Sequence, residues 1–102
     1  MHARNRLALD ATLASREDLR YTPAGLPALS MTLLHASEQA EAGGRRKVDC
    51  EIAAVSFGAI AEAIARLPVG TALRCEGFLA RRWRTGTTLA LHITNFETTQ
   101  DH

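Results

Sequence analysis

Two short clusters of basic residues are the part of this sequence best suited to chemistry with another molecule. One occupies residues 45–47 (Arg-Arg-Lys), and the other occupies residues 81–84 (Arg-Arg-Trp-Arg), where a tryptophan lies among three arginines. Neither cluster contains an acidic residue. Guanidinium and ammonium groups bind phosphate, and an exposed ring beside cations stacks on a nucleic-acid base. The pattern indicates either a surface for a single-stranded nucleic acid or two solvated turns.

Catalysis and metal binding find little support in the residue types. The four histidines are His2, His35, His92 and His102. None lies at ligand spacing from Cys50 or Cys75, and metal binding needs several converging ligands. Both cysteines fall on apolar faces of expected strands and are predicted to be small core residues. We therefore expect no catalytic residue, no metal site, no cofactor and no enzymatic activity.

Length and composition bound the architecture. The chain has 102 residues and a mass of 11.1 kDa, which fits one domain over residues 1–102. The net charge is +1 and the mean hydropathy is -0.09. No apolar run approaches the roughly 18 residues of a membrane-spanning helix, and the N-terminus does not look like a secretory signal. We therefore expect a single cytoplasmic domain with no membrane segment.

Five stretches alternate apolar and polar residues with a period of two, which is typical of strands with one buried face. They are residues 6–13, 28–35, 47–55, 72–80 and 88–96. Residues 56–67 instead carry apolar residues at helical spacing. Ser56 can cap this helix, and Pro68 and Gly70 end it. Phe57 shares the apolar stripe of the helix, so we expect it in the core.

The order strand, strand, strand, helix, strand, strand predicts a mostly β protein with one short helix. It is the order of the OB-fold, a five-stranded Greek-key barrel. Residues 15–27 are expected to be a long loop, residues 36–46 a polar and mobile hairpin arm, and residues 81–87 a basic hairpin. OB-folds bind ligands on strands 2 and 3 and on the loops that join strands 1–2 and 4–5. Both basic clusters border that face in this layout.

The chain resembles the bacterial single-stranded-DNA-binding proteins along nearly its whole length. Their first two strands, with an Arg-Tyr-x-Pro-x-Gly loop, resemble the stretch NRLALDATLASREDLRYTPAGLPALSMTLL. Their helix resembles SFGAIAEAI, and their Glu-Gly-x-Leu strand with its basic-Trp loop resembles VGTALRCEGFLARRW. Those proteins carry a long tail, whereas this chain ends at ETTQDH. In this respect the chain resembles the tailless family of primosomal replication proteins N. The stretch ASEQAEAGGRRKVDCE also resembles the polar stretch before a strand cysteine in that family.

The resemblance implies a cytoplasmic homodimer that binds single-stranded DNA as part of the replication-restart primosome. It also implies that the protein bridges a restart helicase and a helicase-loading factor. The aromatic residue that often precedes the third strand in the family is replaced here by Val48-Asp49, which leaves Trp83 as the chief platform for stacking. The candidate nucleic-acid-binding residues are Arg20, Tyr21, Arg45, Arg46, Lys47, Arg81, Arg82, Trp83 and Arg84.

Two other functions stay open from the residues. One is an OB-fold protein–protein adaptor without a primary nucleic-acid role, in which the arginine clusters meet acidic partners. The other is an oligosaccharide-binding module, which needs aromatic residues that this chain mostly lacks. Trp83 itself has the alternative of packing in its loop or at a dimer contact.

Overall fold

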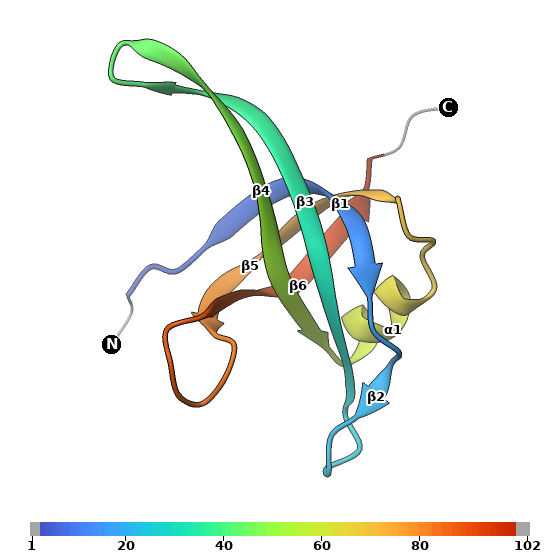
Figure 1. Ribbon diagram of the computed structural model, residues 1–102. Coiled ribbons are helices and arrows are strands. Elements are labelled where there is room, and N and C mark those ends of the chain that lie inside the picture. Colours follow the sequence, from blue (N-terminus) through green and yellow to red (C-terminus); the bar gives the residue numbers. More distant parts are fainter. Residues whose placement is uncertain (1–2, 100–102) are drawn as a thin grey trace.

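Five long strands close into a barrel in the computed structural model, which describes residues 3–99 (Figure 1). The strands are β1 (Leu7–Arg16), β2 (Arg20–Tyr21), β3 (Pro27–Glu41), β4 (Gly44–Phe57), β5 (Ala72–Arg81) and β6 (Leu89–Thr98), and the helix is α1 (Ala59–Ala65). The sheet order is β1-β5-β6-β4-β3-β2, and a further pairing of β1 with β3 closes the barrel. Strands β4 and β6 pair in parallel. The prediction of an OB-fold with one short helix is confirmed.

The core lies where the inward faces of the strands meet. Its fully buried apolar side chains include Leu13, Leu29, Leu33, Ile64, Leu73, Cys75 and Leu91. Removing one such leucine side chain from water contributes about 1.5–3 kcal/mol. Helix α1 covers one end of the barrel with Ala61 and Ile64, which are both fully buried. The period-two pattern therefore identified the inward face of the barrel strands.

The helix is shorter than predicted because β4 continues through Phe57. Ser56 lies inside β4 and is buried, and its hydroxyl has no hydrogen-bond partner among the described residues. The prediction that Ser56 caps the helix is therefore wrong. The residue before the helix is Gly58, whose φ of 72° favours glycine. The chain leaves the helix at Arg66, before Pro68 and Gly70, as the sequence predicts.

Two connections contain more strand than expected. Within the expected loop 15–27, Arg20 and Tyr21 form β2 and pair with the start of β3. The expected arm, residues 36–46, is a hairpin in which β3 and β4 stay paired up to Glu41 and Gly44. The turn between them has positive φ at Ala42 and Gly43. The pairing of β3 with β4 therefore continues in the arm, beyond the part of the two strands that packs on the core.

The two cysteines occupy different environments, and the expectation of two core cysteines is half wrong. Cys75 is fully buried, whereas Cys50 is exposed on the part of β4 that leaves the barrel for the arm. Cys50 continues the apolar alternation of its strand, but no core lies above it there. Burial raises the pKa of the Cys75 thiol to about 11.

A thiol reagent is therefore expected to modify Cys50 and leave Cys75 unreacted in the folded protein at pH 8. The thiolate is the reactive form, and Cys75 lacks both access and thiolate character. Quantitative labelling with an aromatic disulfide should give one reactive thiol per folded chain and a second only in denaturant. A Cys50→Ser variant serves as the control, and rapid labelling of this variant without denaturant would contradict the prediction.

Candidate nucleic-acid interface

A groove of about 380 Å³ on the outside of the barrel brings together residues from distant parts of the sequence. Arg20 comes from β2, Arg81 from the end of β5, and Arg82 and Trp83 from the loop between β5 and β6. These side chains line the groove over the outer surfaces of β4 and β6, and Glu17 is the one acid among the described lining residues. The balance of charge favours an anionic ligand.

The Trp83 ring is held in solvent beside a cation. It is 61% exposed, and the guanidinium carbon of Arg82 lies 4.9 Å from the ring centroid. The loop is closed at its base by a backbone hydrogen bond of 2.7 Å from Arg82 N–H to the Thr88 carbonyl. A guanidinium over an indole face is a favourable pair, and each group limits the motion of the other. The ring therefore has no core to enter and is free to stack on a flat ligand.

The other basic residues near this end contribute differently. Arg20 donates a 3.0 Å hydrogen bond to the Ser30 hydroxyl, which directs its guanidinium over β3. Tyr21 is 61% exposed, but it is not among the residues that line the groove. Arg84 is exposed in the same loop as Trp83 and, within residues 3–99, forms no ion pair. Arg84 does not line the groove, but its guanidinium is available to bind a phosphate in the same loop as Trp83.

Three rings cross the outer surface of β4, β6 and β5 beside these cations. The Phe57 ring lies 6.0 Å from the His92 ring, and the Phe78 ring lies 4.8 Å from His92 on its other side, both in stacked orientation. Phe57 and Phe78 are 40% and 38% exposed. The expectation of a buried Phe57 is therefore wrong. This row of rings was not predicted from the sequence, although extending the alternation of β4 by two residues places Phe57 on the same outward face as Val55.

The second basic cluster lies elsewhere. Arg45, Arg46 and Lys47 are in β4 near the tip of the arm, at the opposite end of the molecule from the β5–β6 loop (Figure 1). Arg45 forms a 2.7 Å ion pair with Glu38, and Arg46 forms a 3.3 Å ion pair with Glu41. The structure therefore does not bring the two clusters together, and acids of the arm offset two of its three cations.

No metal-binding arrangement is found among residues 3–99, where no three His, Cys, Asp or Glu side chains group closely enough to hold an ion. His2 and His102 lie outside the described residues. In the same part of the chain, no helix has the length and apolar character needed to cross a membrane.

Comparison with known proteins gives consistent matches over most of the chain. A family model described as another single-strand binding protein family matches residues 5–95. The replication restart protein PriB of Bordetella pertussis is 42% identical over 89 residues, which cover 87% of this chain and 83% of that protein. The replication restart protein PriB of Nitrosomonas europaea is 36% identical over 90 residues, or 88% of this chain and 83% of that protein.

Solved structures agree with these sequence matches. The structure of priB from Ralstonia solanacearum is 41% identical, superposes with a TM-score of 0.89, and covers 96% of this chain and 100% of that one. The single-stranded DNA binding protein from Thermus aquaticus is 27% identical with a TM-score of 0.75, and the match covers 95% of this chain and 50% of that one.

Proposed function

Because this chain belongs to the single-strand binding protein family and, within it, to the replication restart proteins PriB, we propose that it binds single-stranded DNA through the groove beside the β5–β6 loop. The contacts come from Arg20, Arg81, Arg82, Trp83 and Arg84. Tyr21 adds a contact beside the groove. The arm residues Arg45, Arg46 and Lys47 lie away from the groove and form a second, weaker contact for the same strand. The protein acts by binding and has no catalytic residue in this proposal.

One observation carries this proposal: the exposed Trp83 ring, with Arg82 over it, lies beside a groove that Arg20 and Arg81 also line. Cations bind the sugar-phosphate backbone, and rings stack on bases without regard to sequence. A duplex hides the faces of its bases, so this combination favours single strands. The neighbouring rings of Phe57, His92 and Phe78 extend the surface on which further bases can stack.

Titration of a labelled oligonucleotide, single-stranded and then double-stranded, at two salt concentrations tests the proposal. We expect a preference for the single strand and a steep loss of affinity with salt, because each neutralised phosphate contributes a log–log slope of roughly −0.7. Weak salt dependence with no preference for single strands would instead favour a protein–protein adaptor.

Replacing Trp83 by alanine is expected to weaken single-strand binding by about 1–2 kcal/mol, the lower part of the range for loss of one stacked base. Trp83 is the single tryptophan of the chain, so its fluorescence reports on the ligand directly. We expect quenching by saturating oligonucleotide in the native protein.

Trp83→Phe keeps a flat ring and is the matched control, which should retain most of the affinity. The exposed ring contributes little to the core, so the melting temperature should not change. Unchanged fluorescence together with normal binding by Trp83→Ala would assign the ring to loop packing or to a dimer contact.

A homodimer is expected because part of β1 has an unpaired edge. Residues 7–12 pair with β5 on one side, and pairing with β3 begins only at Thr12, so the described residues leave the other edge of Leu7–Ala11 open. Exposed strand edges favour pairing with another chain. Sedimentation at micromolar concentration should give the mass of two chains, and a monomer would contradict the prediction.

The proposed role is to bridge a restart helicase and a helicase-loading factor in the cytoplasm during replication restart. The names of its relatives support a role in replication restart. Bridging is what the family resemblance adds to that role. Purified helicase and loader from the same organism should co-sediment more strongly when this protein is present. Equal co-sedimentation with and without the protein would refute bridging while leaving DNA binding intact.

A further inference from the structure

His92 lies at the centre of the row of rings on the outer surface of the barrel. It belongs to β6 and is half-buried, and its ring centroid lies 4.8 Å from that of Phe78 and 6.0 Å from that of Phe57, with both rings stacked on it. Its side chain also lines the groove beside the β5–β6 loop. A ring with stacked neighbours presents its edge, where the two nitrogens of an imidazole lie. His92 can therefore offer a ligand polar atoms that the two phenylalanines lack.

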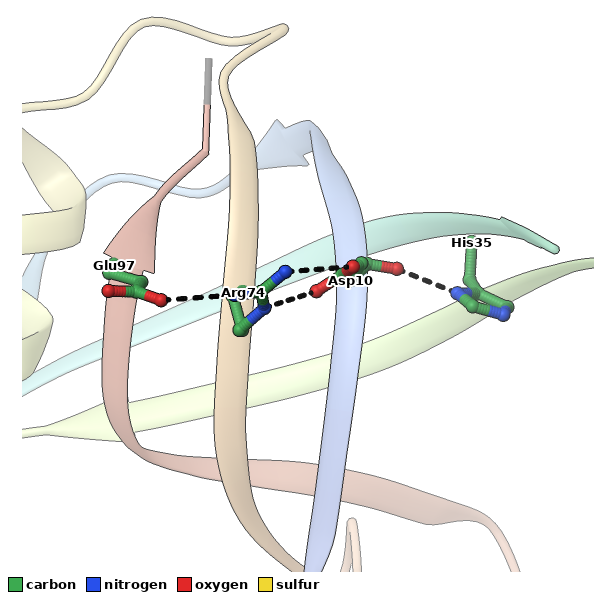
Figure 2. Close-up of polar contacts among 4 residues, drawn as sticks. All are labelled: Asp10, His35, Arg74 and Glu97. Carbon is green, nitrogen blue, oxygen red and sulfur yellow. Dashed lines mark hydrogen bonds and ion pairs between the residues drawn. The ribbon is translucent and has the colours of Figure 1, made fainter. Parts of the chain in front are cut away.

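The ring nitrogens of His92 are available to a ligand. Neither forms a hydrogen bond with any residue between 3 and 99. The other histidine of this part of the chain, His35, has both nitrogens engaged. Its Nδ1–H donates to the Asp10 carbonyl at 2.6 Å (Figure 2), and its Nε2 accepts from the Ser37 hydroxyl at 2.8 Å. His35 therefore ties β1 to β3, whereas His92 is open to an incoming group.

The charged side chains around His92 are mostly cations. Those that line the groove with it in the described part of the chain are Glu17, Arg20, Arg81 and Arg82. The residues that β4 contributes to the groove are all uncharged. A separate hollow at β1 and β5 is lined by one further cation and one further acid, Arg6 and Glu76. A positive charge on the imidazole would join three arginines and one glutamate, so it gains a partner when an anion enters the groove.

We propose that His92 binds a phosphate of the DNA strand as an imidazolium, so that binding of single-stranded DNA takes up a proton from solvent. Imidazole is the side chain that ordinarily changes its charge between pH 5 and 8. The imidazolium donates from both nitrogens, and the faces of neighbouring phenyl rings stabilise a cation. The neutral ring has one N–H donor and no charge. This inference rests on the proposed binding of single-stranded DNA and adds to it a residue and a pH dependence.

The affinity for single-stranded DNA should therefore rise as the pH falls. Binding and protonation are reciprocal: if the protonated protein binds DNA more tightly, DNA favours the protonated protein by the same factor. We expect affinity to increase about three- to tenfold from pH 8 to pH 6, which is the effect of one charge-assisted hydrogen bond. The log–log salt dependence should become steeper by about 0.7, because one more phosphate is neutralised.

Anisotropy titrations of a labelled oligothymidylate without terminal phosphate, at pH 6 and pH 8 in buffers free of phosphate, test the proposal. Thymine bases and phosphodiesters keep the same charge over this range, so a change in affinity comes from the protein. His92→Phe keeps a stacked ring, His92→Gln keeps a polar side chain, and both should bind equally well at the two pH values. Calorimetry in two buffers of different ionisation enthalpy should detect proton uptake by the native protein and none by His92→Phe.

His35→Gln is the matched control and should keep the pH dependence, because His35 does not line the groove. Its neighbour Asp10 stays ionised over the same range, since the 2.9 Å hydrogen bond from Arg74 lowers the pKa of Asp10 (Figure 2). His2 and His102 are present in every variant, so the comparison isolates His92.

Three outcomes would overturn the proposal. They are equal affinity of the native protein at both pH values, an undiminished pH dependence in both His92 variants, and loss of the pH dependence in His35→Gln. Thermal unfolding of the same samples verifies that the variants are folded. Absence of binding at both pH values would refute the proposed DNA binding itself, whereas tight binding that does not change with pH would refute only the role of His92.

Discussion

Replacing Arg81, Arg82 and Arg84 together by alanine is expected to weaken binding of single-stranded DNA by about 10- to 100-fold at low salt. All three side chains belong to the end of β5 or to the loop that follows it, and two of them line the groove. Loss of three phosphate contacts should also flatten the log–log salt dependence by about 2, at roughly 0.7 for each phosphate. Anisotropy titrations across a series of salt concentrations measure both effects.

The arm supplies a matched control with the same number of cations. Replacing Arg45, Arg46 and Lys47 by alanine should have the smaller effect, because Glu38 and Glu41 already pair with the two arginines. Thermal unfolding should leave both triple variants folded, since every replaced side chain is exposed. A larger change of salt slope in the arm variant would move the main binding surface from the groove to the arm.

Replacing Gly77 by alanine is expected to destabilise the fold by about 3 kcal/mol, at the upper end of the cost of forcing extra atoms into a packed site. A Cβ at this position would overlap the carbonyl oxygen of His92 and lie 2.8 Å from its carbonyl carbon. The obstacle is backbone of β6, which cannot move aside as a flexible side chain would. Strand β5 has its register shift at Glu76 and Gly77, so the close approach is part of how the two strands pair.

Urea unfolding followed by circular dichroism measures this loss of stability. Gly44→Ala is the matched control, because its Cβ would meet nothing closer than the Glu41 carbonyl oxygen at 3.9 Å. We expect a change within about 0.5 kcal/mol for the control. Equal stability of the two variants would show that β5 and β6 can move apart at the register shift without any loss of free energy of unfolding.

The order of elements and the inward faces of the barrel could be read from the sequence because both depend on local periodicity. Leu29 and Leu33 alternate with Ser30 and Thr32. When one face of a strand is buried, this pattern allows only one assignment of residues to the inward and outward faces. The same rule failed at Cys50. Periodicity shows which side of a strand a residue faces, but whether a core exists above that side depends on where the ribbon leaves the barrel.

For the candidate binding residues, too, some features follow from the local sequence and others only from the tertiary structure. The sequence by itself determined that residues 81–87 form a basic, tryptophan-bearing hairpin, because charge and turn composition are local properties. Only the tertiary structure placed Arg20 beside that hairpin and separated it from Arg45 and Arg46. Pairing between strands decides which distant segments share a surface. The row of Phe57, His92 and Phe78 arose in the same way, because Phe57 on β4 reaches His92 only through the parallel pairing of β4 with β6.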